Sequence, residues 1–269
     1  MKSAVSRVVA AVSVVVALGA SAACGGSGDD DAGKSANPTK SAKPHASEGS
    51  SKLEKAALTA ADVKGYKVEK AEEAEKGEKP DGSAAPPAGK PSRAECGPLA
   101  AMLGGGGGTG AGTGAPKKAK SHVSRILTAA DDKDSTTTDV GLSSYAGTDA
   151  KKAVADLRTA LRSKKCAAFR VGEQRYLGVR SLSAPDKGDE AVSYKLAHRR
   201  GEYVTRESVT VVRSGSTLAV FSASNLYDPE GVQRDKDAEK DGMDGSGTPT
   251  ADQDPKVNPK IVEAQLDKI

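Results

Sequence analysis

The chain has 269 residues, 28% of them charged, and a formal net charge of +4. This nearly balanced charge argues against a nucleic-acid partner, which would require a concentrated basic face. Because the sequence has no Trp and only two Phe, its core has to be built from aliphatic residues and Tyr. A core of this kind is thin per residue and would benefit from a covalent cross-link.

Residues 1–23 have the pattern of an export signal. Lys2 and Arg7 provide a positive start, an apolar run follows over 8–18, and small residues lead to Cys24. The apolar run is far shorter than the roughly 20 residues that a membrane-spanning helix needs. An ordinary secretory signal followed by an incidental cysteine is the alternative interpretation.

The same segment resembles a bacterial lipoprotein signal. The resemblance implies that Cys24 becomes the first residue of the mature chain and carries a diacylglyceryl thioether. Ser21 stands where such signals normally carry Leu three residues before the cysteine. Each methylene buried in the membrane adds about 0.8 kcal/mol to the free energy of membrane binding. One acyl chain gives only weak, reversible binding, so stable anchoring needs more than one. We therefore expect a lipid-anchored protein on the outer face of the cytoplasmic membrane.

Residues 24–52 should form a flexible tether, and 53–269 a single domain. The tether is rich in Gly, Ser, Ala, Lys and Asp and has almost no large apolar residue. Such a composition cannot offset the entropy cost of ordering. Three further segments rich in Gly, Pro or charge read as disordered loops of the domain, at 72–92, 104–120 and 229–256.

The domain opens with a short helical face from Leu53 and an extended segment at 65–68, and 96–103 begins another short helix. Alternating apolar and polar residues then predict strands at 122–129, 136–145, 168–174, 176–183, 190–198, 202–213 and 217–224. Between the second and third of these, Thr148 can cap a helix that leads to Cys166. Asn258 and Pro259 start a last helix, which should dock onto the domain; a frayed tail is the alternative.

Consecutive hairpins with few helices indicate an α+β fold. We expect an antiparallel sheet of about six or seven strands flanked by helices, with the helices on one side and the long tether and insertions left disordered.

Cys96 and Cys166 remain once Cys24 is assigned to the lipid. Disulfides persist in exported proteins, so we expect these two cysteines to be bonded; two free thiols are the alternative. Two cysteines without nearby histidines are too few for a zinc site.

Three other matches to known motifs occur in segments that cannot support their chemistry. The P-loop letters at 28–35 lie in the tether without a preceding strand, and the glycines at 105–110 cannot open a helix. The acidic stretch from Asp237 departs from a calcium-binding loop, because Thr248 occupies the position where a bidentate Glu is needed. We expect no metal and no cofactor.

Several segments together suggest a family. They are 58–66 (LTAADVKGY), 96–99 (CGPL), the helix ending at 161–166, the hairpins up to Asn225 and the ending 264–269 (AQLDKI). In this pattern the chain resembles actinobacterial cell-surface lipoproteins whose domain is similar to the extracellular sensor domain of the mycobacterial kinase PknH. The resemblance covers roughly 53–269. It implies an antiparallel sheet flanked by helices, with a cleft that accepts a ligand.

Four side chains are candidates for such a cleft. His198 extends the apolar line of its strand, where Tyr194 precedes it, and the pair could lie at the mouth of a cleft. Arg180 and Arg206, with Glu207, could line a polar pocket. The alternatives are a histidine at the edge of the core and ordinary exposed strand residues.

The sequence favours a non-catalytic binding or sensor domain at the cell envelope. Its partners would be the membrane, through the lipid anchor, and a small or lipid-like ligand, a cell-wall polymer or an envelope protein. A structural or interaction lipoprotein without a small-molecule pocket is the second hypothesis. A hydrolase with an unfamiliar site is the third, and no nucleophile motif supports it.

Overall fold

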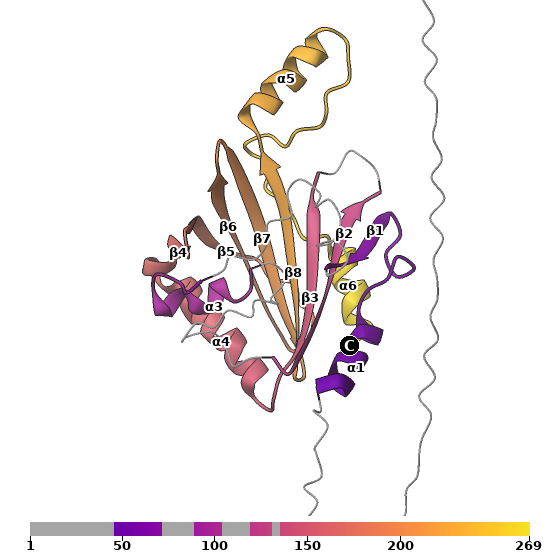
Figure 1. Ribbon diagram of the computed structural model, residues 1–269, viewed down its shortest axis with the longest axis vertical. Helices are drawn as coiled ribbons and strands as arrows, with labels where there is room; N and C mark the ends of the chain where they lie inside the picture. Colours follow the sequence, from indigo (N-terminus) through magenta and orange to yellow (C-terminus); the bar gives the residue numbers. More distant parts are fainter. Residues whose placement is uncertain (1–45, 72–88, 104–118, 131–134) are drawn as a thin grey trace, which may run out of the picture. The chain divides into compact units, whose positions relative to one another are not determined.

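The computed structural model describes residues 46–71, 89–103, 119–130 and 135–269. They contain one antiparallel sheet of eight strands in the order β1-β2-β3-β8-β7-β6-β5-β4 (Figure 1). The strands are β1 Tyr66–Lys70, β2 Ser121–Ala129, β3 Thr137–Ser144, β4 Phe169–Val171, β5 Gln174–Leu182, β6 Glu190–Arg200, β7 Tyr203–Ser214 and β8 Thr217–Tyr227. The expected export signal, Cys24 and the segments 72–88 and 104–118 lie outside the described residues.

The sheet consists of two runs of strands that are consecutive in the chain. The first run is β1-β2-β3 and the second is β4 to β8, and the pairing of β3 with β8 joins them at the centre. The β6–β7 and β7–β8 connections are tight turns containing Gly201 and Gly215, whose φ angles are +63° and +57°. Glycine reaches this region without steric cost, which is why these turns can close a hairpin in two residues.

Helices pack on both faces of the sheet, while α5 extends beyond its end (Figure 1). The bounds of the described helices are α1 Ala46–Ala56, α3 Gly97–Ala100, α4 Asp149–Arg162, α5 Pro229–Lys240 and α6 Pro259–Leu266. We call the face that packs against α3 and α4 the first face, and the face that packs against α1 and α6 the second face (Figure 1). The expectation of helices on one side is therefore wrong. The reason lies in the central strands, where Val211 belongs to the core of the first face and its neighbour Val212 to the core of the second.

The α+β class and the antiparallel sheet are confirmed, but the expected six or seven strands are corrected to eight. The additional strand is β1, which pairs with β2 from Tyr66 to Lys70. The sequence marks this segment only as extended, because five residues are too few to establish an alternating pattern.

Two segments that were expected to be disordered contain helices. α1 begins at Ala46, so the expected tether over 24–52 ends in a helix. The expected loop at 229–256 begins with α5, where Asp228 caps the helix by accepting a hydrogen bond from the amide of Glu230 at 3.0 Å. Only Gly231 of α5 is buried. The helix therefore has no apolar periodicity by which it could be predicted.

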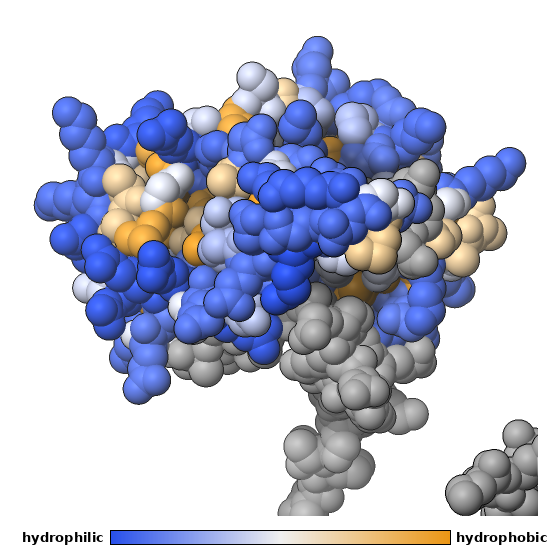
Figure 2. All heavy atoms as spheres, turned by 90° about the horizontal axis from the view of Figure 1, so that it is seen from above, coloured by the Kyte–Doolittle hydropathy of each residue, from blue (hydrophilic) through white to orange (hydrophobic). Residues whose placement is uncertain are grey.

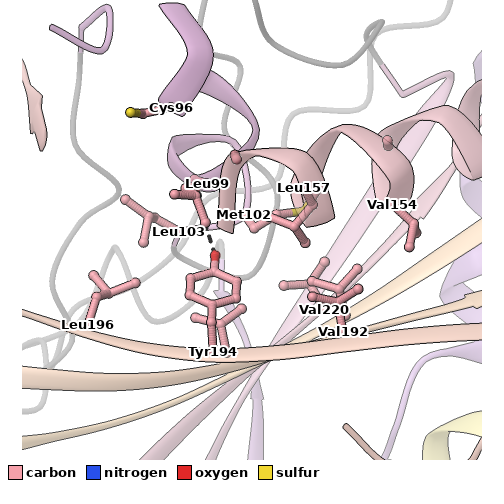
Figure 3. Close-up of a cluster of buried hydrophobic side chains, with 14 of the residues drawn as sticks. Cys96, Leu99, Met102, Leu103, Val154, Leu157, Val192, Tyr194, Leu196 and Val220 are labelled. Carbon is pink, nitrogen blue, oxygen red and sulfur yellow. Dashed lines mark hydrogen bonds between the residues drawn. The ribbon is translucent and has the colours of Figure 1, made fainter. Parts of the chain in front are cut away.

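The core of the first face is closed by the Cys96–Cys166 disulfide, which confirms the expected bond. Its Cα atoms are 5.5 Å apart, and the two cysteines are separated by 70 residues in sequence. It joins the segment leading into α3 to the segment that follows α4. Leu99 and Met102 of the α3 region and Leu157 of α4 pack together over the sheet (Figure 3).

The last helix docks on the second face, as expected. Asn258 caps α6 by accepting a hydrogen bond from the amide of Lys260 at 3.0 Å, and it donates another to the Tyr66 hydroxyl at 2.8 Å. Ile261 is fully buried, and Gln265 donates a hydrogen bond to the carbonyl of Ala56. These contacts hold α6 against the sheet and fix the chain that leads into it.

Candidate functional site

A pocket of about 350 Å³ opens on the second face, beside the start of α6. This volume lies within the usual range for small-molecule sites. Three strand hydroxyls form its floor, Ser193 from β6 and Ser208 and Thr210 from β7. The walls come from the β5–β6 loop and from the segment that leads into α6: Leu182, Ser183, Ala184, Pro185, Lys187, Pro255, Lys256, Val257, Pro259, Val262 and Glu263.

The floor presents hydroxyl groups that can bind a ligand. Ser193 and Thr210 are register partners, and their hydroxyl oxygens are 2.8 Å apart, so one of them donates to the other. Ser208, which is only 5% exposed, contributes a third hydroxyl to the floor. A hydroxyl has one donor and two acceptor sites, so the three groups keep capacity for hydrogen bonds with a ligand.

The β5–β6 loop, which forms one wall, is fixed to the end of β7. The amide of Asp189 donates to the carbonyl of Arg213 at 2.8 Å. The Asp189 carboxylate accepts from the Arg213 guanidinium and from the amide of Gly215, both at 2.8 Å. This wall is therefore a preformed part of the pocket.

Gly188 lets this loop approach β7 closely. Its φ angle is +66°, and a Cβ atom at this position would lie 2.5 Å from Cγ1 of Val212 and 2.6 Å from the carbonyl oxygen of Arg213. The backbone atom cannot move aside cheaply. Only glycine fits both the backbone angle and the space.

We expect Gly188→Ala to destabilise the domain more than Gly201→Ala. Both glycines have a positive φ, but nothing lies within 4 Å of a Cβ atom at Gly201. The conformational cost alone is about 1 kcal/mol for each, and the clash should add about 1–2 kcal/mol at Gly188. Urea unfolding measures both variants, and equal losses of stability would contradict the close packing of the loop.

Charged side chains stand at the mouth of the pocket. The Lys187 ammonium lies 3.2 Å from the Glu263 carboxylate, so this pair is close to neutral. Lys256 is exposed and forms no ion pair within the described chain. The mouth therefore carries one uncompensated positive charge.

The four side chains expected at a common cleft lie on different faces. Tyr194 and His198 are on the first face, where Tyr194 is fully buried and its hydroxyl donates to the carbonyl of Leu99 at 3.4 Å (Figure 3). Arg206 is on the opposite face and donates to the carbonyls of Thr250 and Ala251. Arg180 is exposed and is the register partner of Lys195 on β6. None of the four lines the pocket of the second face.

Tyr194 and His198 lie instead near a buried carboxyl group, Glu207 on β7. The Glu207 carboxyl oxygen is 3.8 Å from Nδ1 of His198, and this nitrogen is buried without a hydrogen-bond partner in the described structure. Burial, reinforced by the charge of Asp139, raises the pKa of Glu207 to about 7, although the Ser222 hydroxyl donates to it. Burial lowers the pKa of His198, with a smaller contribution from Arg200.

Asp139 on β3 belongs to the same polar group and was not singled out from the sequence. Burial raises its pKa to about 6. No pattern in its own strand marks it, because Asp139 lies on the opposite face of β3 from the core residues Val140 and Leu142 and its cross-strand partner is the polar Ser222. The pocket beside α6 includes none of Asp139, His198 and Glu207 in its lining.

A second, more polar groove of about 820 Å³ lies between the end of the sheet and α5. Asp235 of α5 organises its wall, because its carboxylate accepts hydrogen bonds from the amides of Ser246 and Thr248 at 2.8 and 2.7 Å. Hydrophilic residues predominate over the view in Figure 2. Polar atoms form a larger share of the lining of this groove than of the lining of the pocket beside α6.

Within the described ranges, no group of three or more His, Cys, Asp or Glu side chains is placed to hold a metal ion. None of the helices in these ranges is long and apolar enough to cross a membrane. Comparisons of the sequence with protein-family models and with curated proteins find no match.

Proposed function

We propose that the protein is a lipid-anchored, extracytoplasmic binding domain of the cell envelope that holds a small ligand without chemical conversion. The pocket beside α6 is the observation that carries this proposal. It combines largely apolar walls with a floor of strand hydroxyls, those of Ser193, Ser208 and Thr210. Small-molecule sites typically have this composition, a mostly apolar surface with a few polar groups that orient the ligand.

The disulfide supports the proposed location outside the cytoplasm. Bonds such as Cys96–Cys166 form and persist in oxidising compartments and are rare in the cytosol. The signal-like segment at 1–23 and the resemblance to actinobacterial lipoproteins with a PknH-type sensor domain point to the same location.

The two other hypotheses receive less support. A hydrolase would need its titratable groups at an accessible site, and Glu207 and His198 are 7% and 4% exposed. An interaction module would show a contiguous apolar patch. The large apolar side chains exposed in the described chain are Leu182, Tyr203 and Met243, and they belong to three different segments.

The lipid anchor is tested by Cys24→Ala. The wild-type protein should be found in the membrane fraction of the producing cells, and the variant should be released or remain unprocessed, because it has no thiol to acylate. Cys24→Ser is a matched control and should behave like Cys24→Ala. A wild-type protein that is recovered only from the soluble fraction would contradict the anchor.

The bound ligand is tested by native mass spectrometry of the protein purified from the cells that produce it. A retained mass of small-molecule size is expected in the wild type and should be lost in Ser208→Leu, which fills the floor of the pocket. An identical retained mass in both proteins would place the ligand elsewhere, and the absence of any mass would contradict the binding function.

A further inference from the structure

We propose that the pocket beside α6 binds a single-chain amphiphile, with its hydrocarbon part inside and an anionic head group at Lys256. This inference rests on the proposed binding function and names the chemical class of the ligand. The walls, the floor and the charge at the mouth each support one part of it.

The walls favour a hydrocarbon. Leu182, Ala184 and Pro185 lie on one side, and Pro255, Val257 and Val262 on the other. None of these side chains can form a hydrogen bond. Apolar atoms of a ligand therefore gain from leaving water here, whereas polar atoms lose their hydration without replacement.

The floor limits how polar the buried part can be. It offers three hydroxyls, those of Ser193, Ser208 and Thr210, and the bond between Ser193 and Thr210 uses part of their capacity. A sugar or another polyhydroxylated ligand would have more polar groups than these three can pair and would bury some of them without partners. Each of these would reduce affinity about tenfold or more, so the pocket discriminates against this class.

The size of the pocket favours one chain. A volume of about 350 Å³ lies near the lower end of the range for ligand sites. A two-chain membrane lipid would leave much of its apolar surface in water. A single straight chain can enter the pocket while its head group stays at the mouth.

The mouth favours an anion. Lys187 is neutralised by Glu263 at 3.2 Å, whereas Lys256 forms no ion pair within the described chain. A carboxylate or a phosphate at the end of the chain would lie in water beside Lys256. Such an exposed pair is modest in strength and is screened by salt.

Titration calorimetry with straight-chain alkanoates of increasing length tests the inference. Affinity should rise about fourfold for each added methylene until the pocket is full and then level off. The matching alcohols should show the same increment per methylene but bind about two- to fivefold more weakly at low salt. A parallel series of alkyl phosphates distinguishes the two possible head groups.

Variants locate the site. Lys256→Gln should reduce alkanoate affinity about two- to fivefold and abolish the dependence of this affinity on salt. Lys260→Gln is the matched control, because it makes the same charge change on α6 outside the pocket, and it should leave the affinity unchanged. Ser208→Leu should abolish binding. Ala184→Trp lies on the exposed β5–β6 loop, so it should obstruct the mouth without disturbing the sheet.

Three results would overturn the inference. They are the absence of any increment with chain length, equal affinity for alkanoates and alcohols at low salt, and unchanged binding in Ala184→Trp. If a different molecule is retained by the wild type and lost in Ser208→Leu, the amphiphile is wrong and the binding function stands. If neither alkanoates nor any retained molecule is found, both proposals fail.

Discussion

Replacement of Cys96 and Cys166 by alanine is expected to lower the free energy of unfolding by about 4 kcal/mol. The disulfide spans 70 residues, and the unfolded chain gains the freedom of this whole loop when the bond is absent. The loop contains β2, β3 and α4, so its closure constrains a large part of the domain. Because the domain has few aromatic residues to bury, this loss should be a large fraction of its total stability.

Urea unfolding monitored by circular dichroism measures this effect. Reduction of the wild-type protein should lower its stability by a similar amount and leave the double alanine variant unchanged. A difference below about 1 kcal/mol between the wild type and the double variant would mean that the bond does not support the fold.

Glu207→Gln is expected to stabilise the protein at alkaline pH and to have little effect at acidic pH. Burial raises the pKa of Glu207 from 4.5 to about 7. The neutral carboxyl is thus the form that the folded protein favours. Its stabilising contribution is complete below about pH 4.5 and is lost as the pH rises through about 7. The glutamine variant keeps a neutral side chain of the same shape and should gain about 3 kcal/mol at pH 8.

The pH dependence of this difference distinguishes ionisation from packing. Thermal or urea unfolding should give nearly equal stabilities for wild type and variant at pH 4 and a difference of about 3 kcal/mol at pH 8. His198 has a lowered pKa, so its own contribution is present above about 6.5 and is lost as the pH falls. It is present in both proteins and cancels in the comparison. Glu202→Gln, in the exposed β6–β7 turn, is the matched control, and an equal gain in that variant would contradict the role of burial.

The sequence predicts those parts of the fold that have a clear periodicity. The strands β5 to β8 are nine to twelve residues long, and α4 places Ala153, Val154 and Leu157 on one buried side. These elements were predicted near their observed bounds. α5 was missed because a helix that is polar on all sides carries no such pattern.

The number of sheet faces that helices cover was predicted wrongly, although the central strands contain evidence of it. In β7 and β8 both sets of alternating residues are buried, as the neighbours Val220 and Phe221 show. A run buried on both sides indicates layers above and below the sheet. This feature was available in the sequence of β8, where apolar and small residues follow one another.

The pocket could not be predicted because it is formed by residues that are distant in the chain. Ser208 is an ordinary polar residue in its strand, and its significance depends on the β5–β6 loop and on Pro255 and Val257, which close over it. The sequence pointed to Tyr194 and His198 instead, because they share one face of a strand that could end at the mouth of a cleft. The packing of α3 places Tyr194 inside the core.

The central proposal is tested most directly by intact-mass spectrometry of the protein extracted under native conditions from the membranes of the producing cells. We expect a mature chain that begins at Cys24, carries the mass of a diacylglyceryl group and retains one small amphiphile. A chain without acyl mass that is recovered from the cytosol with an empty pocket would contradict it.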